Sequence, residues 1–154
     1  VNDCLAAALE LENVTLINPM GMDAEGREWG LLRSGYVSEQ ALSDFLGHVK
    51  SRLGCLGLRY VDAGKPVRKV AVGGGSCCSE MREAVDAGCD TFVTADIKYN
   101  LFRDAYDLGI NLIDAGHFYT ENPVIKVLAD KIATSFPQIQ VVISKTHTDC
   151  MKFF

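Results

Sequence analysis

Residues 112–121, Leu-Ile-Asp-Ala-Gly-His-Phe-Tyr-Thr-Glu, are the stretch from which the fold of this protein can be inferred. An apolar strand leads into a glycine turn, and the spacing predicts that a helix begins soon after it. His117 follows the turn, and Glu121 comes four residues later. An imidazole and a carboxylate at a strand-to-helix junction are suited to hold a metal ion or to act as an acid and a base.

The same strand-to-helix unit is repeated through the middle of the chain. Apolar strands are predicted at residues 67–72, 91–94 and 110–113, and helices at residues 79–87 and 100–108 connect them. Strands that alternate with single helices form right-handed βαβ units, which build parallel sheets. The predicted fold class is therefore α/β, with a three-layer α/β/α arrangement around a mixed, mainly parallel sheet.

The flanking segments add helices and short strands. Asn2 or Asp3 is predicted to cap an N-terminal helix, and Ser38 to cap a longer helix that ends at Gly54. Thr120 is predicted to cap the helix that follows His117. The remaining predicted elements are the N-terminal helix itself (5–11), two strands that could form a small antiparallel ribbon (14–17 and 31–37), a short strand (58–61) and a last strand (141–143).

Composition narrows the class of protein. A chain of 154 residues suits one domain, and 48% hydrophobic residues are ordinary for a globular protein. The net charge of −5 argues against nonspecific nucleic-acid binding. No apolar run has the length of a membrane span, and no signal peptide is visible. We therefore expect a cytoplasmic protein whose six cysteines are free thiols, most of them buried.

Polar residues gather where the predicted parallel strands end. In an open parallel sheet, ligands bind beyond the carboxyl ends of the strands. Three consecutive strand ends would bring a glycine-rich loop, an Asp/Lys pair and an Asp/His/Glu set to one edge. In chain order these candidates are Gly74, Gly75 and Ser76, then Asp96 and Lys98, then Asp114, His117 and Glu121.

Each candidate also has an alternative interpretation. Gly74, Gly75 and Ser76 could offer backbone N–H groups to an anion, or could simply form a tight turn. Asp96 could be a ligand, a base or a helix cap, and Lys98 could be an ordinary surface residue. Asp114 could orient His117 or could accept hydrogen bonds from the loop backbone.

Two further groups are weaker candidates. His147 follows the last predicted strand and could reach the same edge of the sheet. Cys77 and Cys78 lie close to the glycine loop, but nothing else in the sequence supplies a thiolate-rich shell for a soft metal. We therefore expect both cysteines to be packing residues.

Three motifs, in this order, resemble the carboxyl-terminal half of the Nif-three-like family. They are Val-Ala-Val-Gly-Gly-Gly-Ser at 70–76, Thr-Ala-Asp-Ile-Lys-Tyr at 94–99 and the 112–121 stretch quoted above. Residues 2–6 also resemble the segment where the second half of that family begins. The resemblance spans essentially the whole chain, and its most specific part is the His-x-x-x-Glu block.

This resemblance implies a fold, a cofactor and a reaction. Members of the family are dinuclear metal-centre proteins, also named GTP cyclohydrolase type-two homologues. They have two similar, intertwined α/β/α units with two divalent metal ions between them. His117 and Glu121 correspond to the metal ligands of the second unit, while the first unit supplies further histidines and an aspartate. The metal could be zinc, iron or manganese. Members assemble into ring-shaped hexamers, and the implied reaction is metal-assisted hydrolysis of a nucleotide ring.

We expect the first unit of the family to be missing from this sequence, which would then depart from the family pattern. We expect residues 1–37 to be a linking segment from that missing unit, to whose sheet the strands at 14–17 and 31–37 could belong. Residues 38–154 would then be the α/β/α metal-site domain. Gly73 stands where the family often has cysteine, and Asn100 where histidine is common.

The resulting hypothesis is a fragment of a metal-binding protein that is inactive when isolated. His117 and Glu121 would bind metal, Asp114 would orient His117, and Gly74, Gly75 and Ser76 would receive a small anionic or nucleotide ligand. Two other functions remain open. One is a non-enzymatic, metal-dependent scaffold or regulatory protein, and the other is a phosphate-ligand binding module.

Overall fold

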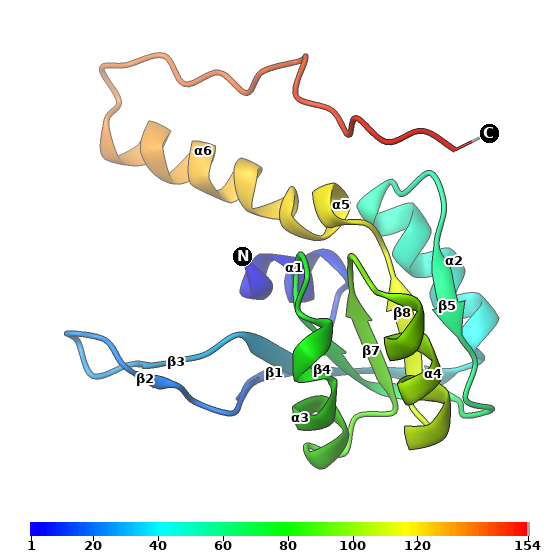
Figure 1. Cartoon of the computed structure of the whole chain (residues 1–154). Helices are drawn as coiled ribbons and strands as arrows, with labels where there is room; N and C mark the ends of the chain where they lie inside the picture. The colour runs from blue at the N-terminus through cyan, green and yellow to red at the C-terminus, as the bar shows by residue number, and fades with distance from the viewer. Residues whose placement is uncertain (154) are drawn as a thin grey trace.

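The computed structural model describes residues 1–153, which form a three-layer α/β/α fold (Figure 1). The central sheet has the strand order β1-β4-β6-β7-β8-β5, and a separate hairpin pairs β2 with β3. The helices and strands are α1 (Asn2–Ala8), β1 (Glu12–Ile17), β2 (Gly21–Met22), β3 (Glu28–Trp29), β4 (Leu32–Gln40), α2 (Leu42–Leu53), β5 (Arg59–Val61), β6 (Val67–Val72), the 3₁₀ helix η1 (Cys78–Glu80), α3 (Met81–Asp86), β7 (Thr91–Thr94), α4 (Tyr99–Leu108), β8 (Asn111–Asp114), α5 (His117–Glu121) and α6 (Pro123–Ser135).

Helices cover both faces of the sheet because its central strands are apolar on both sides. One core packs α1 and α2 against Val70, Val93 and Ile113. The other core packs α3 and α4 against Phe92 and Leu112. Neighbouring strand residues alternate between the two cores, as the period of two in a strand requires. The predicted α/β class and three-layer arrangement are confirmed.

The parallel part of the sheet consists of β6, β7 and β8. The outer pairings β1 with β4, β4 with β6, and β5 with β8 are antiparallel. Parallel pairing is therefore narrower than the sequence suggested, because β4 and β5, which flank the three parallel strands, run in the opposite direction. β4 runs without a break across residues 37 and 38, so the predicted antiparallel ribbon joins the same sheet as these units.

The N-terminal helix is held by side chains that were predicted to cap it. Val1 is the N-cap residue of α1. The Asn2 side chain instead accepts a hydrogen bond from Gly74 N, at 2.7 Å, and donates to the Leu31 carbonyl. Asp3 pairs with Arg33 Nε at 2.6 Å. The predicted caps are therefore wrong, since both side chains make long-range contacts.

Three other local predictions are also wrong. Ser38 lies inside β4. The N-cap of α2 is Ala41, so the helix begins three residues later than predicted. Thr120 lies inside α5, where it is fully buried. Residues 141–143, predicted as a last strand, have no regular secondary structure. Their apolar, β-branched sequence favours a strand, but no neighbouring strand pairs with them in the described part of the chain.

The helix α6 and the segment after it lie outside the two cores. In Figure 1, α6 (orange) extends above the sheet and the C-terminal segment (red) runs back alongside it. A hollow of about 540 Å³ between them is lined by Ile125, Leu128, Val141, Val142 and Ile143, among others. No residue of α6 is fully buried. Among residues 1–153, every helix is too short or too polar to cross a lipid bilayer.

The central strand β7 should dominate the stability of this fold. Phe92 on β7 is fully buried. We predict that Phe92→Ala lowers the free energy of unfolding by roughly 3–5 kcal/mol, through lost burial and the cavity left behind. Urea unfolding followed by circular dichroism measures this change. Val142→Ala, at a side chain that is 72% exposed, should change it by less than about 0.5 kcal/mol. Similar losses for the two variants would contradict the core described here.

Candidate functional site

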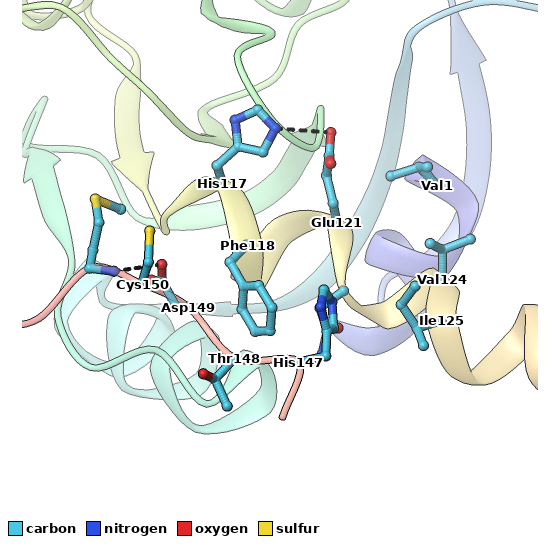
Figure 2. A pocket seen from close by; sticks show the side chains of 12 residues that line it. Val1, His117, Phe118, Glu121, Val124, Ile125, His147, Thr148, Asp149 and Cys150 are labelled. Carbon is cyan, nitrogen blue, oxygen red and sulfur yellow. Dashed lines mark hydrogen bonds and ion pairs between the residues drawn. The ribbon is translucent and has the colours of Figure 1, made fainter. Parts of the chain in front are cut away.

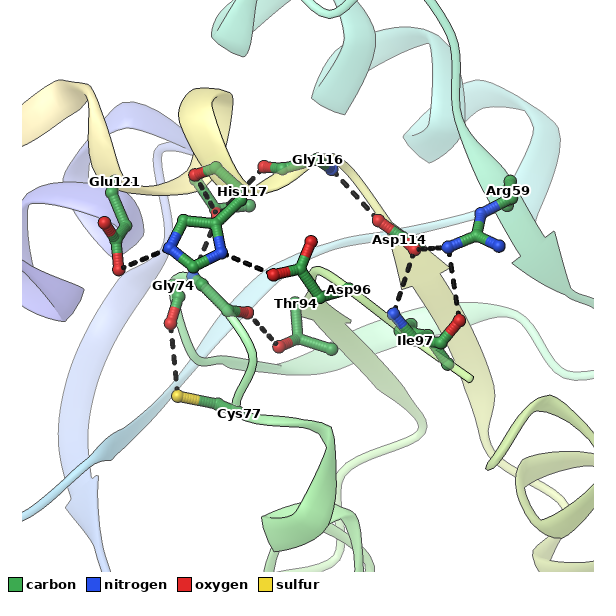
Figure 3. A network of polar contacts seen from close by, with 12 residues as sticks. Arg59, Gly74, Cys77, Thr94, Asp96, Ile97, Asp114, Gly116, His117 and Glu121 are labelled. Carbon is green, nitrogen blue, oxygen red and sulfur yellow. Dashed lines mark hydrogen bonds and ion pairs between the residues drawn. The ribbon is translucent and has the colours of Figure 1, made fainter. Parts of the chain in front are cut away.

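Gly75 joins the three loops that leave the carboxyl ends of β6, β7 and β8. Its carbonyl oxygen accepts hydrogen bonds from Cys77 N, Ala95 N and Thr94 Oγ1, each at 3.0 Å. Its N–H donates to Thr120 Oγ1 of α5, also at 3.0 Å. The predicted convergence of these strand ends at one edge is therefore confirmed (Figure 3).

His117 lies at the centre of this edge, between two carboxylates. Its Nδ1 is 2.5 Å from Asp96 Oδ2, and its Nε2 is 3.4 Å from Glu121 Oε1. The three side chains come from the β7 loop and from α5, and each is nearly half exposed. Figure 3 shows the imidazole held between the two acids.

Asp96, the hydrogen-bond partner of His117, has an uncommon backbone conformation. Its φ is +52°, in the left-handed region that few residues other than glycine, asparagine and aspartate adopt. Such conformations persist where the surrounding structure fixes them, and they are frequent at functional sites. Here the Ala95 N–H on Gly75 and the Ile97 N–H on Asp114 fix the backbone on either side.

The two acids change the protonation of His117. The hydrogen bond to Asp96 raises the pKa of His117 above its ordinary value of 6.5, although burial partly opposes this shift. The negative charges of Asp96 and Glu121 raise it further. A carboxylate on Nδ1 also fixes the ring orientation and leaves Nε2 directed at Glu121, as second partners of metal-binding histidines do.

Asp114, predicted to orient His117, contacts other groups. Its carboxylate pairs with Arg59 and accepts hydrogen bonds from Ile97 N at 3.2 Å and Gly116 N at 3.1 Å. In this structure the imidazole is held by Asp96, and the predicted role of Asp114 stays a prediction. Asp114 fixes the backbone just before His117 and just after Asp96, which is the alternative that the sequence had left open.

The glycine loop has fewer free N–H groups than an anion site needs. Gly74 N donates to Asn2 Oδ1 and Gly75 N donates to Thr120 Oγ1. Ser76 is exposed. An anion at this loop would have to displace Asn2 or Thr120. The anion site at Gly74, Gly75 and Ser76 therefore stays a prediction without support from the hydrogen bonds of this structure.

Lys98 and His147 lie apart from the His117 contacts. Lys98 is exposed, and its side chain forms no ion pair among the described residues. His147 packs against Phe118, with ring centroids 5.0 Å apart. Figure 2 shows His117 and Glu121 on one side of α5, and Phe118 with His147 on the other.

The cysteines are free thiols in the described chain, as predicted. Cys55, Cys78 and Cys89 are buried, and burial raises the pKa of each thiol to about 11. Burial also raises the pKa of Cys77, whose Sγ donates to the Gly74 carbonyl at 3.1 Å. Cys78 lies in the core formed with α3 and α4, and Cys77 packs against that core.

Two hollows adjoin the His117 contacts. One, of about 530 Å³, is lined by Val1, His117, Glu121 and residues of the C-terminal segment including His147 (Figure 2). The other, of about 320 Å³, is lined by Arg59, Asp96, Asp114, Tyr119 and Asp149, among others. The hydrogen-bonded pair of His117 and Asp96 therefore lies between the two hollows. His117 lines the first, mostly apolar hollow, and Asp96 lines the second, which has three aspartates.

The donor atoms fit a divalent metal in kind but not in number. An imidazole nitrogen and a carboxylate oxygen are ligands that zinc, iron and manganese accept. Metal sites need three or four protein ligands, or fewer with several waters. Among residues 1–153, no group of three or more His, Cys, Asp or Glu side chains is arranged to hold a metal ion.

Comparison with known proteins identifies the family of this chain. Residues 1–150 match the family model described as Duf34/NIF3 (NGG1p interacting factor 3). The chain belongs to the DUF34/NIF3 family. It is 27% identical over 155 residues to a GTP cyclohydrolase 1 type 2 homolog of Clostridium perfringens, a match that covers 99% of this chain and 58% of the relative. It is 34% identical over 130 residues to one of Pseudomonas aeruginosa, covering 80% and 51%. The chain therefore spans little more than half the length of these relatives.

Solved structures show the same fold. A Bacillus cereus protein related to NIF3 superposes with a TM-score of 0.86 at 23% identity, over 99% of this chain and 69% of that one. Reduced HcgD from Methanocaldococcus jannaschii gives a TM-score of 0.64 at 24% identity, over 86% and 50%. At this level of identity the likeness establishes the fold of the DUF34/NIF3 chain and nothing more.

Several residues that shape the site carry no sequence signal. Asn2, Arg59 and Thr120 each reach it from a distant element or from inside a helix. No sequence pattern indicated the positive φ of Asp96 either. Only the left-handed tolerance of aspartate, directly after a strand, could have marked Asp96 as a turn residue.

A side chain at Gly75 should displace Glu121 and His117. A Cβ there would lie 2.6 Å from Glu121 Oε1 and 3.1 Å from His117 Nε2, at a φ of +64°. We predict that Gly75→Ala lowers the free energy of unfolding more than Gly64→Ala, a matched control with φ +70° and open space around it. Backbone strain alone should cost the control about 1–2 kcal/mol. Chemical denaturation of both variants measures the difference, and equal losses would show that the Gly75 loop yields freely.

The pKa of His117 should depend on Asp96. Because the folded pKa is raised, protonated His117 stabilises the fold fully below about pH 6.5, and this contribution is lost as pH rises through the folded pKa. We predict that Asp96→Asn moves the pKa of His117 down towards 6.5, as measured by NMR titration of its ring protons in the metal-free chain. Asp130→Asn, on exposed α6, should leave it unchanged. An unshifted His117 in Asp96→Asn would contradict the hydrogen bond.

Proposed function

We propose that His117 and Glu121 supply two ligands of a divalent-metal site that residues outside this chain complete. The observation that carries this proposal is the orientation of His117, whose Nδ1 is held by Asp96 while Nε2 faces Glu121 at 3.4 Å. The Asp96 carboxylate thus fixes the orientation of the imidazole ring. The Glu121 carboxylate lies beside the other ring nitrogen, where both could bind one metal ion.

The surroundings of the pair support a ligand role over a purely structural one. His117 and Glu121 are nearly half exposed, so they contribute little burial to the fold. Exposed ion pairs of this kind are worth little stability. Yet the arrangement of His117 and Glu121 depends on a positive φ at Asp96 and on the absence of a side chain at Gly75. An uncommon backbone conformation and a close backbone approach that serve only a weak surface contact are better explained by a bound ligand.

A bound divalent metal would act as a Lewis acid and lower the pKa of a coordinated water. The chain's own residues prepare for it in two ways. Asp96 keeps the Nδ1 proton in place, so that Nε2 offers its lone pair. Glu121 adds negative charge that offsets the cation. Deprotonation of His117 must precede binding, so metal affinity should rise with pH through the raised pKa of His117.

The complete protein would then be a metal-dependent hydrolase, and we propose a nucleotide as its substrate class. Relatives that carry the name GTP cyclohydrolase 1 type 2 homolog support this choice. The pairing of two metal ions and the assembly into hexameric rings are further proposals of the same kind. The isolated chain, with two ligands, should bind metal weakly and turn over no substrate.

Manganese broadening of NMR signals tests the ligand assignment directly. The chain has three histidines, so His48 and His147 are internal controls for His117. We predict that substoichiometric Mn²⁺ broadens the ring signals of His117 first, because its Nε2 can share the cation with Glu121 Oε1 at 3.4 Å, whereas Nε2 of His48 is hydrogen-bonded to the Leu9 carbonyl. Glu121→Gln should remove this preference, and a chelator should restore the signals.

Two results would contradict the proposal. Equal broadening of the three histidines would show that His117 and Glu121 form no ligand pair. Tight calorimetric binding of two Zn²⁺ ions by the isolated chain would show that the site is complete without further residues.

A further inference from the structure

A groove of about 450 Å³ lies between α4 and β5, and it includes neither His117 nor Glu121. Its volume is within the range of small-molecule sites. Aromatic rings and two guanidinium groups form most of its walls. The residues concerned are Arg59, Tyr60, Tyr99, Phe102, Arg103 and Tyr106.

The tyrosines of α4 face away from the core, whereas Phe102 is half-buried and packs partly against it. Tyr99, Phe102, Arg103 and Tyr106 follow the i, i+3, i+4, i+7 spacing of one helix face. A stripe of this kind usually packs inside a protein, but Tyr99 is 86% exposed and Tyr106 is 60% exposed. The core side of α4 is formed by Ala105 and its neighbours instead. Tyr99, Arg103 and Tyr106 therefore line the groove without packing in the core, and Phe102 contributes to both.

Both arginines of the groove are held against aromatic rings. The Arg59 guanidinium lies 5.3 Å from the centre of the Phe102 ring, and that of Arg103 lies 5.5 Å from the centre of the Tyr106 ring. Stacked guanidinium groups keep their N–H donors free at the edges, where they meet phosphate or carboxylate oxygens in a forked geometry. The groove thus presents ring faces and oriented cations side by side.

We propose that this groove binds a planar ring compound that carries an anionic group, such as a nucleotide. The ring would stack on the tyrosines, and the anion would meet Arg103 with Arg59 beside it. Stacking on aromatic side chains tolerates any flat ring. The proposal goes beyond the metal site and does not rest on it, since no residue of the groove contacts His117.

The acidic partners of the arginines leave room for a ligand anion. Arg103 pairs with Asp107 at 3.4 Å, but both side chains are more than half exposed, so the pair is weak. Arg59 is held more firmly by Asp114 and by the Ile97 carbonyl. Arg103 is therefore the main anion contact, and Asp107 is a competitor for it.

Arg59 also connects the groove with the edge of the sheet that holds Asp96. It lines both the groove and the acidic hollow beside Asp96 and Tyr119. A ligand anion at Arg103 would therefore lie next to a charged contact that fixes the backbone around Asp96. This continuity distinguishes the groove from an isolated surface patch.

The test is an NMR titration of the metal-free chain, in EDTA, with adenosine 5′-monophosphate. We expect saturable shifts of the Tyr60, Tyr99 and Tyr106 ring signals. Tyr106→Ala and Arg103→Ala should each weaken binding by about tenfold, whereas Tyr106→Phe should retain it. Asp107→Asn should tighten binding about two- to threefold, because it removes the competing carboxylate. Arg27→Ala, an exposed arginine on the β2–β3 hairpin, is the matched control and should have no effect.

Three outcomes would overturn the proposal. These are no saturable shift in the wild-type chain, binding that survives both Tyr106→Ala and Arg103→Ala, and inorganic phosphate or adenosine alone binding as well as the nucleotide. Groove signals that change with protein concentration and not with nucleotide would identify an interface between copies, and would also overturn it. Binding should survive His117→Ala, so failure of the metal site and failure of the groove are distinguishable.

Discussion

The hydrogen bonds of one glycine govern the geometry of the candidate site. The carbonyl of Gly75 accepts from the loop after β6 and from the end of β7, and its N–H donates to Thr120 in α5. Glu121 is the next residue after Thr120, and Asp96 follows Ala95, which also bonds Gly75. The positions of both acids around His117 therefore depend on the Gly75 backbone, where an added Cβ would lie 2.6 Å from Glu121 Oε1 at a φ that favours glycine.

The fold was predictable where sequence signals are local. The strands β6, β7 and β8 and their crossover helices were identified from apolar runs bounded by glycine turns, such as Gly88 and Gly109. Prediction failed where a neighbour decides the outcome. Ser38 looks like a helix cap, yet β4 extends through it because β6 pairs with Tyr36 before it and Gln40 after it. Residues 141–143 have strand propensity, but propensity forms no strand without a pairing partner.

The candidate site shows the same division. His117 and Glu121 were identified because they are close in sequence and follow a strand end. The partner of His117 was not, since Asp96 and Asp114 both lie close to the ends of neighbouring strands, and pattern alone does not tell which carboxylate turns towards the imidazole. The choice is made by the left-handed backbone at Asp96 and by Arg59, which draws Asp114 away. Both are tertiary effects.

The exposed helix α6 has a consequence for the behaviour of the chain in solution. Val127, Leu128, Ile139, Val142 and Ile143 present apolar surface on α6 and the extended segment beside it. Colloidal stability then depends on electrostatic repulsion between molecules, which carry a net charge of −5. Added salt shortens the range of that repulsion to about 8 Å at physiological ionic strength. The chain should therefore be most dispersed in dilute buffer at a pH well above its isoelectric point of about 5.1.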